Sequence, residues 1–422
     1  MRRSRARVPA GATARSDASR PAAAGGGDRV RGYVGTPPLP DRPALHESDR
    51  SQAQRTLAPS PVLGRGQPLA GLAGLTFLVP VFFVLSFGTG GPEASLEVLA
   101  PLSTFALPAM ATIAFWWEDW PGSTLRAGWS GLTDTLIVIA AGVGLTLVGQ
   151  AVVAGVDTRS LFDPEPGADH VETFPHTMNV AAGVFTVLLQ LTLVCEGWPF
   201  RRLGRLASGF AAFVVACVAG AGAYLLLVHL ETPPKDGLRD PGGPVASVAY
   251  GAWLTALGAW QLVFYVVLRG WPFTAVRRRA VRLPVANAAV IACAWACYLL
   301  MRHALDMPDP QVTAACGCGV AAVLLVAMLF DRWPWTRLSM VPGRTGVVIT
   351  SIAVAGLMYW SLRSYAATLD WGRAHPEDWV AFSALNAVAV GVILHVAVWK
   401  RWPVAVESGA GARPGGGTRP AL

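Results

Sequence analysis

The sequence predicts an all-α integral membrane protein with about ten transmembrane helices, arranged as five helical-hairpin repeats of parallel topology. Three observations support this fold class: the composition, the length of the apolar runs and a repeated Trp-Pro signature. Of 422 residues, 53% are hydrophobic and 14% are charged, whereas a typical soluble domain carries about 25% charged residues. The apolar residues form runs of roughly 20, which is long enough to cross a hydrocarbon core of about 30 Å.

Ten such runs follow one another with short connections, so the sequence leaves no room for a separate soluble domain. They are Leu69–Phe87, Val98–Trp117, Leu132–Val153, Met178–Cys195, Leu206–Leu230, Val245–Leu268, Leu283–Leu305, Val312–Phe330, Val347–Leu362 and Val380–Trp399. We therefore predict a transmembrane domain over residues 67–403. Residues 1–66 are rich in Arg, Ala, Gly, Pro and Ser, a composition typical of disorder, and we predict a disordered basic cytoplasmic tail there. Residues 404–422 are predicted to form a second flexible cytoplasmic tail.

A four-residue signature follows every second run: a charged residue, any residue, Trp and Pro. The five copies are Glu118-Asp119-Trp120-Pro121, Glu196-Gly197-Trp198-Pro199, Arg269-Gly270-Trp271-Pro272, Asp331-Arg332-Trp333-Pro334 and Lys400-Arg401-Trp402-Pro403. Recurrence of this kind marks duplication of one supersecondary unit. We predict a unit of helix, outer loop, helix and Trp-Pro, with repeats at about 67–121, 122–199, 200–272, 273–334 and 335–403.

The chemistry of the signature favours an anchoring role. Trp prefers the headgroup level of a bilayer, and Pro disfavours the α conformation in the residue before it, so each helix is expected to stop on its Trp. We interpret five tryptophans as topology anchors: Trp120, Trp198, Trp271, Trp333 and Trp402. A ligand-binding or partner-binding role for these side chains is the alternative.

The distribution of charge predicts the orientation. Loops on the Trp-Pro side, with the C-terminal tail, hold 16 Arg and Lys against five acidic residues, and loops on the other side hold six against 15. Under the positive-inside rule the Trp-Pro side is cytoplasmic. Both termini then lie on the cytoplasmic side of the cell membrane, and the repeats run parallel to one another. Membrane topology also explains the net charge of +8, so no nucleic acid partner is needed. The preference for Arg over Lys, with abundant Ala and Gly, suggests a bacterial source.

Histidines and carboxylates gather on the predicted outer side. The densest segment holds His170, Glu172 and His176, and neutral imidazole with carboxylate is a ligand set for Zn or Cu. Their spacing matches no zincin motif, so a solvated acidic loop is the simpler interpretation. Haem ligation has little basis, because only His395 lies well inside a run.

Four cysteines lie in two neighbouring runs. Cys293 and Cys297 share one face of their run, and Cys297 is expected at a depth similar to that of Cys318 in the next run, which also holds Cys316. Thiolates would suit Cu(I), and a disulfide is conceivable. Packing of small residues between close helices is the simpler interpretation.

Amide side chains deep in the runs are candidates for a polar binding site, because polar groups are costly in a bilayer. Gln190 and Gln261 lie eight and ten residues before their Trp, near the bilayer midplane. Asn386 is the third candidate for substrate binding, and Asn287 and Gln150 could extend the site. Amides that bridge helices structurally are the alternative.

No nucleophile elbow, P-loop or dinucleotide-binding motif is present, and no cofactor is required by the sequence. The leading hypothesis is a multi-pass plasma-membrane protein that binds or transports a small solute through its helical bundle. The alternatives are a membrane-embedded enzyme or redox protein with a metal at its outer face, and a scaffold or assembly factor that binds a cytoplasmic partner through its basic loops. The lipid bilayer is the one partner that the composition requires.

Overall fold

A computed structural model describes residues 63–126, 128–167, 170–231 and 237–406. All described residues belong to one compact unit. Residues 1–62 of the predicted N-terminal tail and residues 407–422 of the predicted C-terminal tail lie outside the described residues. Within the described ranges, this unit is mainly helical.

Apolar helices occur at all ten predicted places. Within the described ranges, nine are long and apolar enough to cross a membrane, and Met178–Val194 is a shorter apolar helix. Five helices precede a Trp-Pro pair, and each continues from an α-helix into π-helical turns. They are α3 (Pro92–Ala111) with Thr112–Trp116, α5 (Met178–Leu189) with Gln190–Val194, α7 (Ser247–Leu262) with Val263–Val267, α9 (Asp309–Leu324) with Leu325–Leu329, and α11 (Pro376–Phe382) with Ser383–Ala389, α12 (Val390–Ile393) and Leu394–Val398. The other five are α2 (Leu69–Phe87), α4 (Trp129–Val153), α6 (Arg205–Leu227), α8 (Arg279–Leu299, continued by Leu300–Ala304) and α10 (Met340–Ala366).

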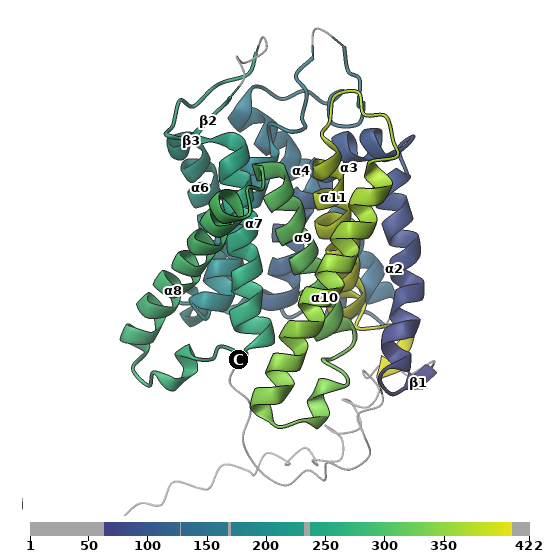
Figure 1. The fold of residues 1–422 in the computed structure, drawn as a ribbon, viewed down its shortest axis with the longest axis vertical. Helices are drawn as coiled ribbons and strands as arrows, with labels where there is room; N and C mark the ends of the chain where they lie inside the picture. Colours follow the sequence, from purple (N-terminus) through teal and green to yellow (C-terminus); the bar gives the residue numbers. More distant parts are fainter. Residues whose placement is uncertain (1–62, 127, 168–169, 232–236, 407–422) are drawn as a thin grey trace, which may run out of the picture. The chain divides into compact units, whose positions relative to one another are not determined.

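The helices that precede a Trp-Pro pair form an inner ring. Neighbours in this ring are α3 and α5, α5 and α7, α7 and α9, α9 and α11, and finally α11 and α3, which closes it. The remaining helices pack outside this ring, and Figure 1 shows α8 and α10 running along the surface beside α7 and α9. We call the two sets the inner helices and the outer helices.

The outer helices carry the apolar surface. Between 17% and 33% of the most apolar window of each outer helix is buried in the protein, against 44% to 67% for the long inner helices. Large exposed side chains lie on all five outer helices, for example Phe83, Ile139, Val218, Trp295 and Ile352. A surface of this kind suits lipid rather than water, and the many apolar helices are those of a multi-pass membrane protein.

Helix packing divides the chain differently from the predicted repeats. Each of the first four inner helices packs extensively against the outer helix that follows its Trp-Pro turn: α3 with α4, α5 with α6, α7 with α8 and α9 with α10. Contacts across the opposite loops, such as α4 with α5, are sparse, and α2 packs against the last inner helix instead. Packing would group each inner helix with the next outer helix, which places the unit boundaries one helix later than the predicted repeats. The predicted grouping into five hairpins therefore stays a prediction about sequence duplication.

The five Trp-Pro junctions share one backbone structure. In each copy the two residues before the Trp have positive φ, as at Asp331 (49°) and Arg332 (62°), and the Trp-Pro bond is cis. The residue before the Trp donates its N–H to a carbonyl six residues earlier, and the Trp N–H donates to a carbonyl three residues earlier. The expectation that each helix stops on its Trp is wrong. Each inner helix ends four residues earlier, at Trp116 in the first copy, because the left-handed residues reverse the chain before the Trp.

Charged residues connect neighbouring junctions. Arg205 lies 3.7 Å from Glu118, Arg282 lies 2.8 Å from Glu196, Arg401 lies 2.6 Å from Asp331 and Lys400 lies 2.7 Å from Asp119. These four pairs join the first junction to the second, the second to the third, the fourth to the fifth and the fifth to the first. The junctions therefore lie together at one end of the bundle, which we call the Trp-Pro end.

Short strands modify the predicted tails. Residues of both tails pair with each other, because β1 (Leu63–Arg65) runs parallel to β4 (Val404–Val406). The disorder predicted up to residue 66 and the flexibility predicted from residue 404 stay predictions for the tails, and three residues of each tail form these strands. Backbone hydrogen bonds to a partner strand order segments whose composition alone does not predict structure. A second pair, β2 (Val228–His229) with β3 (Val245–Ala246), lies at the end opposite the Trp-Pro junctions.

Candidate functional site

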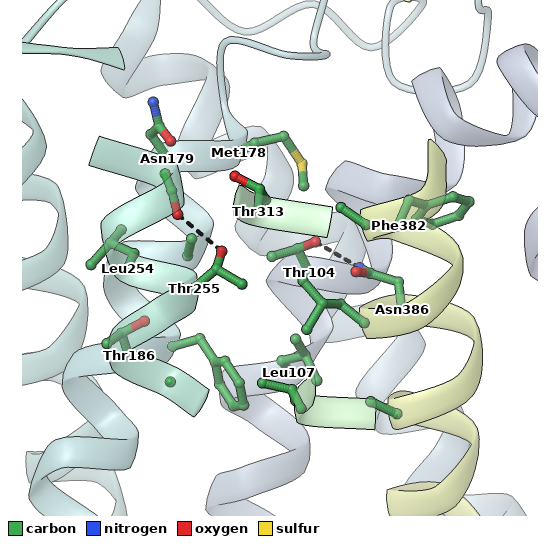
Figure 2. Close-up of a pocket in the computed structure, with 18 of the residues that line it drawn as sticks. Thr104, Leu107, Met178, Asn179, Thr186, Leu254, Thr255, Thr313, Phe382 and Asn386 are labelled. Carbon is green, nitrogen blue, oxygen red and sulfur yellow. Dashed lines mark hydrogen bonds between the residues drawn. The ribbon is translucent and has the colours of Figure 1, made fainter. Parts of the chain in front are cut away.

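A cavity of about 530 Å³ lies inside the ring of inner helices. All five inner helices contribute to its wall (Figure 2), and Tyr224 and Leu230 are its contributions from α6 and the residues just after it. The lining extends from Pro310 and Asp378, at the end opposite the Trp-Pro junctions, to Leu193 and Met328, five residues before their Trp. Its size is that of a pocket for a small organic molecule.

Lining residues recur at fixed distances before the Trp. Nine residues before it, the five inner helices present aliphatic side chains: Ala111, Leu189, Leu262, Leu324 and Ile393. Thirteen residues before it, they present Leu107, Phe185, Gly258, Val320 and Ala389. A spacing of four keeps one face of each helix toward the cavity, because residues four apart lie on the same face of an α-helix. These two apolar layers line the half of the cavity nearer the Trp-Pro end.

A polar layer lies further from the Trp-Pro end. Thr104, Thr255 and Asn386 each lie sixteen residues before their Trp, and all three line the cavity. The Asn386 amide donates to Thr104 Oγ1 and to Ser103 Oγ, both at 2.7 Å, and Figure 2 shows the bond to Thr104. Among the residues that the structure describes, none donates a hydrogen bond to Asn386 Oδ1. This carbonyl oxygen is therefore an acceptor that a bound molecule could use.

The hydroxyl groups of this layer also keep a lone pair that can accept a hydrogen bond. Thr255 Oγ1 donates to the Gly251 carbonyl at 2.9 Å, and Thr104 Oγ1 donates to the Ala100 carbonyl at 2.7 Å. A hydroxyl that donates along its own helix still has acceptor lone pairs for a ligand. Four residues further out, Met178, Gly251, Thr313 and Phe382 form the next layer of the wall.

Charged residues are few in this wall. Within the described ranges, the titratable side chains that line the cavity are His176, Tyr224 and Asp378. His176 and Asp378 lie near the end opposite the Trp-Pro junctions, so the middle and the Trp-Pro half of the cavity hold only neutral side chains. The arrangement can hold a mostly apolar, uncharged molecule and offer it a few hydrogen bonds.

Two of the three predicted amides lie outside the cavity wall. Gln261 is fully buried and donates to Gln190 Oε1 at 2.6 Å, and Gln190 donates to Asn287 Oδ1 at 2.7 Å. The chain of amides joins α7, α5 and α8, and Asn287 also donates to the Leu283 carbonyl. The structure thus brings Gln190 and Gln261 together as predicted, but as a bridge between helices. Asn386 is the candidate that lines the cavity.

Gln150 lies in a separate polar contact at the end opposite the Trp-Pro junctions. Its amide donates to Thr173 Oγ1 at 2.6 Å and to the Asp157 carbonyl at 3.0 Å, and its own carbonyl accepts the Asp157 N–H. These bonds hold the loop after α4 against the end of that helix. Gln150 therefore does not extend the predicted amide site.

The predicted metal ligands bind different partners. His170 Nδ1 lies 2.7 Å from Asp157 Oδ2, and Glu172 lies 3.6 Å from Arg373. Burial raises the pKa of Asp157, but hydrogen bonds from Ser160 and His170 outweigh it and hold that pKa at about 2. His176 lines the cavity instead. Of the described residues, no three His, Cys, Asp or Glu side chains converge as a metal site, so the metal hypothesis for this loop stays without geometric support.

The tryptophans of the junctions differ in exposure. Trp198 and Trp271 are about half exposed, at 49% and 52%, and Trp402 is 37% exposed. Trp120 packs edge-on against Trp117, and Trp333 is partly buried with its indole N–H unpaired. These positions leave the anchoring role a prediction. None of the five tryptophans lines the cavity.

Sequence reasoning missed Thr104 and Thr255, because single threonines in apolar runs carry no signal by themselves. Aligning the five copies on their Trp would have placed both of them level with Asn386. Comparisons with known proteins add nothing to this site: no protein-family model matches the chain, and no curated protein or solved structure matches it.

Proposed function

We propose that the protein binds a small, mostly apolar and uncharged solute in the cavity of the inner ring and moves it across the plasma membrane. One observation carries the proposal: five helices align neutral side chains around a cavity of about 530 Å³ whose polar layer retains the acceptor Asn386 Oδ1. A buried acceptor that is left unpaired costs free energy, so a ligand hydroxyl or N–H group bound there would stabilise the site.

The direction of the cavity supports movement toward the Trp-Pro end. The polar layer lies in the half that reaches the opposite loops, while Leu189, Leu262 and Leu324 line the half toward the Trp-Pro junctions. In this proposal all ten apolar helices span the bilayer, both termini are cytoplasmic, and the solute enters from the outer side. The aliphatic layers form the barrier that must open for release.

Filling the cavity tests the binding step. A Cβ added at Gly258 meets no atom within 4 Å, and Gly258 lines the cavity, so Gly258→Trp places an indole inside it. Gly356 in α10 also has open space around an added Cβ and does not line the cavity, which makes Gly356→Trp the matched control. The probe is 2-naphthol, a neutral molecule with one hydroxyl group, added to protein in lipid nanodiscs and corrected for binding to empty nanodiscs.

We expect Gly258→Trp to abolish saturable binding of 2-naphthol and Gly356→Trp to leave it unchanged. Asn386→Leu should weaken binding by about tenfold, because one hydrogen bond to a buried group is worth about 1 to 1.5 kcal/mol. Binding that is equal in wild type, Gly258→Trp and Asn386→Leu would refute the cavity as the site. A C-terminal green fluorescent protein fusion that does not fluoresce in cells would contradict the proposed orientation.

A further inference from the structure

Three sulfur atoms meet between α8 and α9, outside the cavity and away from the Trp-Pro junctions. Met301 Sδ lies 4.0 Å from Cys297 Sγ and 3.8 Å from Cys316 Sγ. Met301 Sδ therefore lies in contact with both thiols. The sequence suggested Cys318 as the residue level with Cys297. In the structure Cys316 and Cys297 both contact Met301, while Cys318 packs into the main hydrophobic core.

The separations match one coordination geometry. A metal bonded to sulfur at about 2.3 Å with three ligands in a trigonal plane requires sulfur atoms about 4.0 Å apart. The two separations from Met301 Sδ are within about 0.2 Å of that value, so a metal ion would need little rearrangement of the side chains. Two thiolates and a thioether are soft ligands, which select Cu(I) over the harder divalent ions.

The surroundings of the three sulfurs suit a buried metal site. Cys316 is 8% exposed, and it packs in a cluster with Ala252, Ala256 and Val312, next to the partly buried Met307. Tyr298 and Met301 are partly buried against the same cluster. Contacts of this kind orient metal ligands and keep water away from them.

An entry path exists at the end opposite the Trp-Pro junctions. Met301 lies in the last turns of α8, and the Met307 N–H donates to the Met301 carbonyl at 3.0 Å in the connection to α9. The thioether of Met307 therefore lies in a short connection that reaches the surface, beside the cluster that contains Cys316. A second soft ligand near the surface can receive the ion before it reaches the buried thiols.

We propose that Cys297, Met301 and Cys316 form a binding site for one Cu(I) ion. Binding forms two copper–thiolate bonds and one copper–thioether bond, and the two thiol protons are released to solvent. The copper is not oxidised or reduced. The site is separate from the inner cavity, so the proposal stands or fails independently of the solute-binding function.

The test is an anaerobic titration of the reduced full-length protein with Cu(I) in the presence of bicinchoninate, a coloured competitor for Cu(I). We expect one Cu(I) per chain and an X-ray absorption spectrum with three sulfur neighbours at about 2.3 Å. Cys297→Ser and Cys316→Ser should each weaken binding at least about 100-fold, and Met301→Leu should weaken it about 10-fold. Thermal unfolding of each metal-free variant establishes that it is folded.

The chain offers matched controls for these substitutions. Cys293 lies one turn before Cys297 on α8, and Cys318 lies two residues after Cys316 on α9. Cys293→Ser and Cys318→Ser should bind Cu(I) as the wild type does. The proposal is overturned if the Cys297→Ser Cys316→Ser double variant retains wild-type affinity, or if the spectrum shows nitrogen or oxygen ligands. It is also overturned if Zn(II) displaces Cu(I) at equal concentration.

Discussion

At the Trp-Pro end, five chain reversals share one hydrogen-bond pattern, whereas each loop at the opposite end is held by its own set of contacts. The opposite end depends on side chains: the Glu93 carboxylate accepts the N–H groups of Gly372, Arg373 and Ala374, and Gln150 holds the loop after α4. A repeated local structure can be retained in every copy while irregular loops diverge. The Trp-Pro end therefore has one local structure five times over, whereas contacts at the opposite end differ from loop to loop.

Among the substitutions that test this comparison, the largest effect on stability is expected at Arg401. Its guanidinium donates to Asp331 Oδ1 and to the Met328 carbonyl, both at 2.6 Å, and so joins the fourth and fifth junctions. Arg401→Met should lower the free energy of unfolding by about 2 to 3 kcal/mol, because bonds to a charged group are lost and their acceptors are left unpaired. Thermal unfolding in detergent measures this loss of stability.

Arg337 provides the control for that substitution. It is an exposed arginine in the turn Trp335–Arg337 that follows the fourth junction. Arg337→Met should change the stability by less than about 0.5 kcal/mol. If Arg401→Met is no worse than Arg337→Met, contacts between junctions do not stabilise the Trp-Pro end.

Low pH is expected to reduce the stability of the opposite end by a smaller amount. The folded-state pKa of Asp157 is about 2, below its usual value of 3.8. A depressed pKa contributes stability that is present above the unfolded value and is lost as the pH falls from about 5 toward 2. Asp157→Asn should remove this contribution, which we take as about 1 kcal/mol because the site is partly solvated.

Unfolding measured between pH 7 and pH 3 checks this prediction. The wild type should lose more stability than Asp157→Asn over that interval, and the two curves should converge at low pH. Asp370→Asn is the control, because Asp370 is an exposed carboxylate in another loop at the same end. Parallel curves for the wild type and Asp157→Asn would show that the Asp157–His170 contact does not stabilise the loop.

The smallest effect concerns the contact between the third and fourth junctions, where like charges meet. Arg332 has positive φ, and its Nε atom is buried without a partner. Burial is the main cause that lowers the pKa of Arg332, and the charge of the nearby Arg269 lowers it further. Arg332→Gly should raise the free energy of unfolding by about 0.5 to 1 kcal/mol, because glycine adopts this backbone region without a steric cost. Chemical denaturation in detergent measures the change.

Arg332→Ala separates the two causes. It removes the guanidinium but keeps a side chain at positive φ, so it should give less of the gain than Arg332→Gly. Equal gains would assign the effect to charge repulsion alone. A loss of stability in both variants would show that Arg332 makes a favourable contribution to this junction.

Much of the fold followed from the sequence. The ten apolar runs match the ten helices to within a few residues at most ends, because length and hydropathy alone specify a helix in lipid. The pattern of five Trp-Pro pairs also predicted the five positions at which the backbone reverses. The pattern did not show where the helices end, because the left-handed residues before each Trp depend on backbone hydrogen bonds that span six residues.

The candidate site was predicted only in part. Asn386 lines the cavity, whereas Gln261 donates to Gln190 in a bridge between helices. Depth in a run predicts that an amide is buried, and it does not predict which side of the helix the amide occupies relative to other helices. The same limit applied to Cys318, which packs into the main hydrophobic core, whereas Cys316 contacts Met301 together with Cys297.

The sequence by itself determined the class of molecule, the places of its helices and the common signature of its chain reversals, because these depend on local composition and spacing. Only the tertiary structure decided that the helices before each Trp-Pro pair form a closed inner ring. It also decided that the ring encloses a cavity and that Cys316 meets Cys297 and Met301. These features depend on the rotation and packing order of helices distant in sequence, which apolar runs with similar composition do not encode individually.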